Sequence, residues 1–439
     1  MKIDGSTFKD DDVITGFKRH YEQIFSSPIL RPEDSSISSF LENKCKEPEG
    51  SPNIILEKQV TIDEVTNCIK GLRKRKSPGI DGIVNEHIIH GGSTLCYALV
   101  ELLNAIVDTE NTPASWKTSI IIPLYKGNGK DKSAPTSYRP ISLLTCFNKI
   151  FERIMLNRLE SFTSLYCPVF PNPQQQGFQK SLSCVNAAFN LQETILHQWD
   201  QQTDVFVAFL DIKGAFDVVW HEGLFYKLAN LGIVGKTLRT LMNSYQELKC
   251  VVKLQGMTSD PVPVNRSVRQ GGVLSTFYYL VFIDKLLYDL QKSNFGAKIS
   301  SLKVGNPTFA DDISLVTITP ADLQRLINIV HEYANLWKFE ISIEKSCIVA
   351  FTRKRSLKHV PIYYGKSVLN EKTETTHLGM LQSSNGKVKE KILERCQKAK
   401  NAYYESSGMG VRSQGLNQVT AASIYKRIVM PVALYGSEL

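Results

Sequence analysis

The stretch VFVAFLDIKGAFD, residues 205–217, carries the strongest structural signal in this sequence. Residues 205–212 form a continuous apolar run of β-branched and aromatic side chains, which predicts a buried strand. Asp211 lies near the end of this run. Because burying an unpaired charge is costly, an aspartate that abuts a buried strand is unusual in a purely structural role. Asp211 is therefore a candidate functional residue.

A second acidic feature lies further along the chain. The segment TFADDISLV, residues 308–316, sets Asp311 and Asp312 between two short β-prone runs, which predicts a hairpin with an acidic tip. An isolated Asp-Asp pair in a turn is usually only a turn, because aspartate favours that backbone. Together with Asp211, however, the pair offers the hard oxygen ligands that Mg²⁺ prefers. We therefore expect the carboxylates of Asp211 and Asp311 to lie close together.

The composition is that of an ordinary globular chain with a basic balance. The 439 residues are 42% hydrophobic and 22% charged, and the chain is long enough for more than one lobe. Apolar runs such as residues 277–283 are too short to cross a bilayer, so we expect no membrane association. Nine dispersed cysteines without zinc spacing indicate a reducing compartment, the nucleus or the cytoplasm. The net charge of +9 favours a polyanionic partner.

Helical and extended patterns alternate along the chain, which predicts an α+β fold. Residues 221–231 are expected to form a helix. A second helix is expected over 319–337, with Thr319 at its cap and an apolar stripe along one face. Residues 341–351 have strand character, and residues 388–403 predict a late amphipathic helix with a lysine-rich face.

The motifs resemble, in family order, those of non-LTR (LINE-type) retrotransposon reverse transcriptases. DIKGAFD (211–217) resembles the first palm motif, RQGGVLS (269–275) the second, and FADD (309–312) the third. Other segments resemble the family's further motifs: KSPGIDG (76–82), IPLYK (122–126), YRPISL (138–143), QQGF (175–178), SIEKS (342–346), HLG (377–379) and YGSE (435–438).

The resemblance implies a right-hand polymerase fold of fingers, palm and thumb, with an antiparallel palm sheet flanked by helices. Residues 1–60 would form an N-terminal leader and linker. Residues 61–200 would form the fingers, residues 201–355 the palm, and residues 356–439 the connector and a truncated thumb. We expect the chain to be a fragment of a longer polyprotein, because no endonuclease, zinc-knuckle or ribonuclease H sequence is recognised in it.

The resemblance also implies an activity, RNA-directed DNA polymerisation by two-metal phosphoryl transfer. Asp211, Asp311 and Asp312 would hold two Mg²⁺ ions, with Mn²⁺ as an alternative. Lys345 would protonate the departing pyrophosphate as a general acid. The substrates would be an RNA template, a DNA primer and dNTPs, and residues 377–380 would form the primer grip.

The dNTP site is likewise implied by matching positions. Lys126 and Arg139 would grip the triphosphate, and Gln270 and Gly271 would line the template and the nascent base pair. Phe216 would exclude a ribose 2′-hydroxyl and so select deoxynucleotides. The alternative for Phe216 is a core side chain, which is the commoner role of a phenylalanine after a buried strand.

Four positions depart from the family pattern, and two alternative functions stay open. Thr276, Ser342, His377 and Gln179 stand where proline, asparagine, an aromatic residue and arginine are commoner. None removes a metal ligand, yet they leave open a catalytically decayed nucleic-acid-binding relic. The second alternative is a group II intron-type reverse transcriptase, whose third motif usually begins with tyrosine where this chain has Phe309.

Overall fold

The computed structural model describes residues 2–3, 6–7, 12–46, 53–127, 129–352, 360–386, 388–408, 410–411 and 415–439. The chain divides into two compact units, each assembled from segments that are far apart in the sequence. The first unit comprises Met1–Pro171, Lys213–Lys285 and Asn335–Phe339, and the second comprises Asn172–Ile212, Leu286–Ala334 and Glu340–Leu439. Both contain helices and strands, so the predicted α+β class is confirmed. The expected division at residues 60, 200 and 355 stays a prediction.

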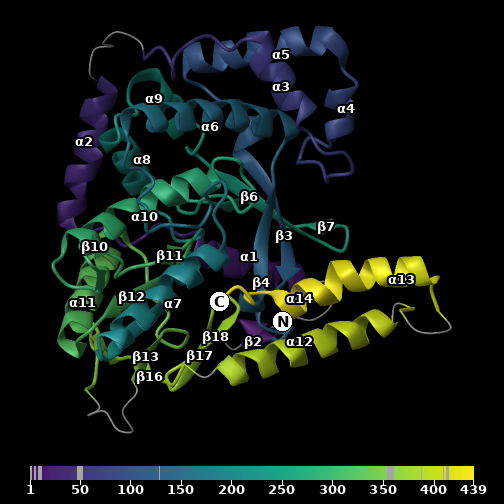
Figure 1. Cartoon of the computed structure of the whole chain (residues 1–439). Helices are drawn as coiled ribbons and strands as arrows, with labels where there is room; N and C mark the ends of the chain where they lie inside the picture. Colours follow the sequence, from purple (N-terminus) through teal and green to yellow (C-terminus); the bar gives the residue numbers. More distant parts are fainter. Residues whose placement is uncertain are drawn as a thin grey trace. The chain divides into compact units, whose positions relative to one another are not determined.

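The first unit contains a small mixed sheet and most of the N-terminal helices (Figure 1). Its strands run in the order β4-β3-β6-β7, with β8 also paired to β6, and β3 and β6 are parallel. The strands are β3 (Thr118–Tyr125), β4 (Tyr138–Leu143), β6 (Lys249–Leu254), β7 (Met257–Thr258) and β8 (Val262–Pro263). The helices are α1 (Val13–Ile24), α2 (Ser35–Lys46), α3 (Ile62–Lys70), α4 (Asn85–Ile89), α5 (Gly92–Thr109), α6 (Cys146–Tyr166), α8 (His221–Asn230), α9 (Gly235–Asn243) and the first part of α10 (Ser275–Lys292).

The segment expected to be a leader contributes two packed helices to the first unit. Phe17 and Tyr21 of α1 are buried and their rings stack, and α1 packs against β6. Asp34, just before α2, forms a buried ion pair with Lys338, with an Oδ2–Nζ distance of 2.6 Å. The segment expected to be a leader with some helix thus contains helices with buried side chains, and its assignment as a leader stays a prediction.

The second unit is built around a five-stranded sheet of order β11-β12-β5-β13-β16. All its neighbouring pairs are antiparallel except β13 with β16. The strands are β5 (Val205–Asp211), β11 (Thr308–Phe309), β12 (Asp312–Thr317), β13 (Cys347–Phe351) and β16 (Asn370–Glu371). Shorter hairpins are formed by β9 (Lys298–Ile299) with β10 (Leu302–Lys303), β14 (Tyr363–Tyr364) with β15 (Ser367–Val368), and β17 (Glu374–His377) with β18 (Met380–Ser383). The helices are α7 (Cys184–Asp200), most of α11 (Pro320–Trp337), α12 (Val388–Gly408), α13 (Gln418–Ile424) and α14 (Met430–Leu434), the last two joined by a π-helical turn, Tyr425–Val429.

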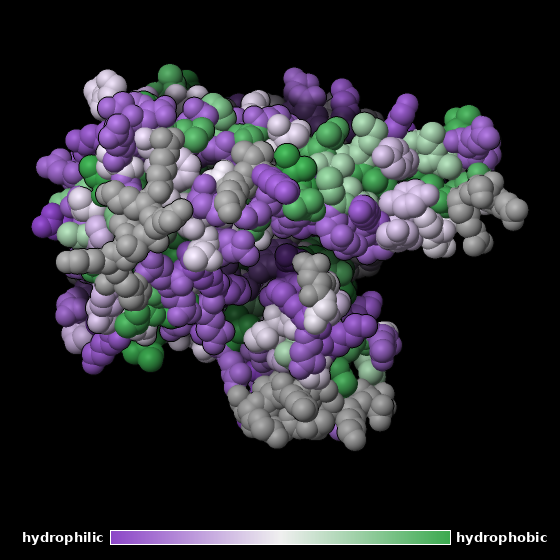
Figure 2. Space-filling model, turned by 60° about the horizontal axis from the view of Figure 1, so that its bottom comes forward, coloured by the Kyte–Doolittle hydropathy of each residue, from purple (hydrophilic) through white to green (hydrophobic). Residues whose placement is uncertain are grey.

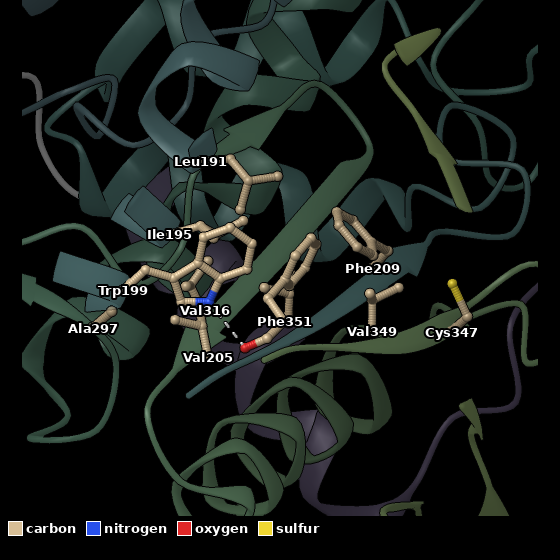
Figure 3. Packing of buried hydrophobic residues seen from close by; sticks show 11 residues of the cluster. Leu191, Ile195, Trp199, Val205, Phe209, Ala297, Val316, Cys347, Val349 and Phe351 are labelled. Carbon is tan, nitrogen blue, oxygen red and sulfur yellow. Dashed lines mark hydrogen bonds between the residues drawn. The ribbon is translucent and has the colours of Figure 1, made fainter. Parts of the chain in front are cut away.

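The predicted strand over 205–212 is the central strand β5, and its burial explains the continuous apolar run. Alternate residues of β5 face helix α7, where Trp199 donates a hydrogen bond of 3.3 Å from Nε1 to the carbonyl of Phe351 (Figure 3). This core cluster comprises Leu191, Ile195, Trp199, Val205, Val207, Phe209, Ala297, Val316, Cys347, Val349 and Phe351. Because strands on both sides and a helix over one face bury β5, polar alternation is not required of it.

The other expected helices are also present. Residues 221–230 form α8, and α11 begins after Thr319, whose Oγ1 accepts a hydrogen bond of 3.1 Å from the Asp322 amide. Helix α12 confirms the late helix and lies beside α14 (Figure 1). The expected apolar stripe of α12 is only partly buried, since Ile392 is 57% exposed. Figure 2 shows apolar side chains along the surface of α12–α14. Across the part of the chain that is described, no helix has the length and apolar character needed to span a membrane.

Candidate active site

The acidic tip is formed by a tight hairpin in the second unit. Phe309 of β11 pairs with Asp312 of β12, so that Ala310 and Asp311 are the two turn residues between them. The predicted hairpin is thus present. Strand β12 also pairs with β5, and its register sets Asp312 directly opposite Asp211. Directly opposed residues of an antiparallel pair project to the same face, so the Asp211 and Asp312 side chains share one.

The neighbouring carboxylates act on the Asp312 side chain. The pKa of Asp312 is raised to about 6, first by its burial and then by the negative charges of Asp311 and Asp211, with the charge of Lys345 opposing the rise. Asp211 and Asp311 therefore both lie within electrostatic reach of Asp312. Such a concentration of negative charge favours a cation at this edge of the sheet.

Lys345 lies against Asp211, with an Nζ–Oδ2 distance of 2.9 Å. The expected strand over 341–351 begins only at Cys347, because residues 343–345 form a turn in which the Ser346 amide donates to the Ser342 carbonyl. The Ser342 amide in turn donates to the Asp211 carbonyl, at 2.8 Å. This turn brings the lysine to the end of β5.

Whether these residues can hold Mg²⁺ depends on the number of protein ligands that the ion requires. Within the described ranges, no group of three or more His, Cys, Asp or Glu side chains is gathered closely enough to hold a metal ion alone. Magnesium is commonly held by one or two carboxylates, with waters and substrate phosphates completing its shell. The cross-strand pair of Asp211 and Asp312 fits that requirement. A site completed by substrate is therefore the arrangement that these residues support.

The raised pKa of Asp312 predicts a pH-dependent stability of the metal-free protein. A carboxyl whose folded pKa of about 6 exceeds its ordinary value of 3.8 stabilises the fold at low pH, and this contribution is lost as the pH rises through about 6. Asp312→Asn imitates the neutral form, so the variant should gain stability over the wild type between pH 4 and 7. Denaturation in EDTA at each pH measures this difference. A difference that stays constant with pH would contradict the burial and repulsion described for Asp312.

The turn expected to be a primer grip is held by the end of the chain. His377 and Met380 pair across the β17–β18 hairpin, and the turn residues Leu378 and Gly379 have φ of +50° and +74°. Tyr435 donates from its hydroxyl to the Leu378 carbonyl, at 2.9 Å. The HLG and YGSE segments, which are far apart in the sequence, are therefore in direct contact.

His377 itself faces the sheet. Its Nε2 lies 3.0 Å from Oγ of Ser314, and its ring centroid is 4.7 Å from that of Phe209. Burial lowers the pKa of His377 to about 4, so the ring is neutral at physiological pH. A neutral imidazole packed on Phe209 fills the place of the aromatic side chain that is commoner at this position.

In the first unit, the RQGG segment is packed closely on β4. The Ser142 amide donates to the Gln270 carbonyl at 2.8 Å. Gly271 has φ of +127°, and a Cβ at this position would lie only 2.6 Å from the Ser142 carbonyl oxygen. Glycine is therefore required here both by the backbone conformation and by the close approach.

Asp217 orients the Gln270 side chain, a contact that the sequence reasoning did not identify. Nε2 of Gln270 donates to Oδ1 of Asp217 at 2.8 Å. Burial raises the pKa of Asp217 to about 6, while this hydrogen bond and the positive charges of Lys126 and Arg266 oppose the rise. Asp217 is the last residue of the DIKGAFD motif, and that position was the only signal in the sequence.

Lys126 and Arg139 belong to the β3–β4 hairpin. Arg139 is exposed and pairs with Leu124 across the hairpin, and Lys126 follows Leu124 by two residues, just beyond the end of β3. The period of two in a strand predicts that both cations share the hairpin face of Leu124. The Lys126 ammonium donates to the Thr136 carbonyl, at 2.6 Å. Lys126 also lies close enough to Asp217 for its charge to lower that pKa.

Phe216 is partly buried in the first unit. Its ring packs edge-on against Tyr279 of α10, with centroids 5.3 Å apart. Helix α10 begins at Ser275, so Thr276 occupies the first turn, a position that also accommodates the proline found in the family pattern.

The candidate site residues fall in two groups. Asp211, Asp311, Asp312 and Lys345 lie in the second unit, whereas Lys126, Arg139, Phe216, Gln270 and Gly271 lie in the first. The carboxylates of the second unit lie at the end of β5 and at the β11–β12 turn, and they have the chemistry of a centre for hard divalent cations.

Comparisons with known proteins identify the family. Residues 128–381, more than half of the chain, match the family of reverse transcriptases (RNA-dependent DNA polymerases). The chain therefore belongs to that family.

Several curated relatives come from mobile elements of Drosophila. The chain is 27% identical to a probable RNA-directed DNA polymerase from transposon BS of Drosophila melanogaster, over 87% of this chain and 42% of that protein. It is 30% identical to the RNA-directed DNA polymerase from mobile element jockey of the same species, over 67% of this chain and 32% of that protein. The expected resemblance to non-LTR retrotransposon enzymes is confirmed. The chain spans less than half the length of these relatives.

Proposed function

We propose that this chain is the polymerase core of an RNA-directed DNA polymerase from a non-LTR retrotransposon. It would extend a primer 3′-hydroxyl with dNTPs on an RNA template. The observation that carries the proposal is the register of β5 and β12, which sets Asp211 opposite Asp312 beside the Asp311 turn. In this proposal the five-stranded sheet of the second unit is the palm of a right-hand polymerase fold.

The acidic tip would bind the metals, and Lys345 would move a proton. Asp211, Asp311 and Asp312 would hold two Mg²⁺ ions, which activate the attacking oxygen and stabilise the leaving oxygen when bound. The Lys345 ammonium would donate a proton to the departing pyrophosphate, a role that its 2.9 Å contact with Asp211 supports. Mn²⁺ has similar ligand preferences and would be an alternative ion.

The first-unit residues would bind the incoming nucleotide. The two cations of the β3–β4 hairpin, Lys126 and Arg139, would neutralise the triphosphate, a role that the exposure of Arg139 supports. Gln270, oriented by Asp217, and Gly271 would contact the nascent base pair. Since the relatives are longer proteins, further domains would supply the other steps of retrotransposition.

Primer extension tests the proposal directly. Purified protein is incubated with an RNA template, an annealed DNA primer, dNTPs and Mg²⁺, and the products are resolved by length. Template-dependent extension that EDTA abolishes is the expected result. RNA binding with no extension under either Mg²⁺ or Mn²⁺ would favour the decayed, nucleic-acid-binding relic.

The sugar preference tests Phe216. If its ring excludes the 2′-hydroxyl, Phe216→Ala should admit ribonucleotides far more readily, because the discrimination is steric. If the ring only packs against Tyr279, truncation should cost about 3–5 kcal/mol of stability and leave the preference unchanged. Incorporation of rNTPs and dNTPs, measured beside thermal melting, separates the two. A variant that melts early yet keeps its sugar preference would rule out the gate.

A further inference from the structure

The QQGF segment, residues 175–178, has no role in the proposed mechanism, yet it contacts the acidic tip within the second unit. The amide of Gln176 donates to the Thr308 carbonyl at 2.8 Å, and the Thr308 amide donates to the Gln174 carbonyl at 2.9 Å. Gln175 and Thr308 form a parallel bridge. The segment therefore extends the sheet beside β11, next to the turn that carries Asp311.

The turn itself contains an unfavourable backbone conformation. Ala310, its first central residue, has φ of +57°. Two-residue hairpins of this kind prefer glycine at that position, because a Cβ disfavours positive φ. Something outside the hairpin must hold Ala310 in this conformation, because its own side chain does not favour it.

The Gln175 carboxamide bonds both backbone polar groups of Ala310. Its Oε1 accepts from the Ala310 amide at 2.8 Å, and its Nε2 donates to the Ala310 carbonyl at 3.1 Å. The same Oε1 accepts from the Gly177 amide at 2.8 Å. Gln175 is only 1% exposed, so these bonds are shielded from competing water.

Gly177 explains why the segment can come so close. A Cβ at this position would lie 2.2 Å from the Ala310 nitrogen and 2.7 Å from its Cα. Both are backbone atoms that cannot move without displacing the turn. The glutamine and the glycine of the segment thus serve the same contact with Ala310.

We propose that Gln175 is a positioning residue for the acidic tip: its carboxamide holds the Ala310 turn so that the carboxylates of Asp311 and Asp312 are aimed at the metal site. This inference rests on the proposed polymerase function. The conformation of a turn residue sets the direction of the side chains that follow it. Misplacing a metal-binding group by about 1 Å costs on the order of 100-fold in rate.

The test compares two neighbouring glutamines. Gln175→Met keeps the size of the side chain and removes both bonds to Ala310. Gln176→Met is the matched control, because Gln176 is also buried and its Oε1 has no hydrogen-bond partner among the described residues. For Gln175→Met we expect kcat for primer extension to fall about 100-fold, with template affinity unchanged. We also expect the Mn²⁺ concentration that half-maximally raises the melting temperature to increase about tenfold.

A second substitution separates positioning from general stability. Ala310→Gly removes the penalty for positive φ, so it should restore part of the metal response and the rate in the Gln175→Met background. A Gln175→Met protein with wild-type rate and Mn²⁺ response would overturn the inference. So would losses in both glutamine variants that simply follow their melting temperatures. If the wild type extends no primer, the polymerase proposal fails, and the Mn²⁺ melting series still decides the role of Gln175.

Discussion

Replacing Asp211 with asparagine should abolish primer extension while leaving RNA binding nearly unchanged. Asp211 lies at the end of the central strand, opposite Asp312 and 2.9 Å from the Lys345 ammonium. Asparagine keeps the shape and removes the charge that would bind the metal. Because metal ions stabilise the transition state by several kcal/mol, we expect a loss of at least about 1000-fold in kcat.

RNA affinity provides the contrasting measurement for this variant. Binding to nucleic acid depends mainly on phosphate contacts, and the chain carries a net charge of +9 before the substitution. Asp260→Asn is a matched control, because its side chain is 85% exposed and is paired with Lys18 far from the acidic tip in sequence. Extension rates and filter binding of both variants should separate catalysis from binding. Near-normal extension by Asp211→Asn would refute the two-metal mechanism.

The second large effect concerns stability: Glu152→Ala should lower the free energy of unfolding by about 3–5 kcal/mol. Glu152 of α6 and Arg269 are 3% and 6% exposed and form an ion pair of 2.7 Å. The other oxygen of Glu152 accepts from the Val273 amide at 2.6 Å. Removing the carboxylate leaves a buried guanidinium without its counter-charge and a backbone amide without its acceptor. Both costs fall on the segment that holds Gln270.

A surface ion pair supplies the control. Glu42 pairs with Lys46 across one turn of α2, and both side chains are well exposed. Glu42→Ala should change stability by about 0.5 kcal/mol or less, because exposed pairs contribute little. Urea unfolding curves of the two variants give the comparison. Equal effects would mean that the Glu152–Arg269 pair does not anchor the RQGG segment.

Local sequence rules predicted the elements that lie within one short segment. The apolar run at 205–212 predicted β5, the residues around Asp311 predicted the hairpin, and Thr319 predicted the start of α11. These predictions succeeded because strand burial, turn chemistry and helix capping depend on neighbours in the chain. The same local patterns singled out Asp211, Asp311 and Asp312, whereas Lys345 was named only through the family resemblance; the roles of all four stay predictions.

Several polar contacts around the candidate site were not predicted. Glu152 is one of several charged residues in α6, and nothing in the local pattern indicates that its partner is Arg269. Asp217 was recognised only as part of a motif. For Gln175, the partner is Ala310, which is 135 residues away and offers only backbone atoms. Backbone partners leave no residue type for a sequence pattern to detect.

The sequence by itself determined the α+β class, the principal strands and helices, and the family through the order of its motifs. Only the tertiary structure decided the register that sets Asp211 opposite Asp312 and the turn that brings Lys345 to Asp211. It also decided the hydrogen bonds between the Gln175 carboxamide and the Ala310 backbone. The physical reason is the distance along the chain over which each kind of interaction acts. Propensity and periodicity act over a few residues, whereas strand register and buried polar pairing are fixed by which distant segments bury one another's surface and satisfy one another's hydrogen bonds.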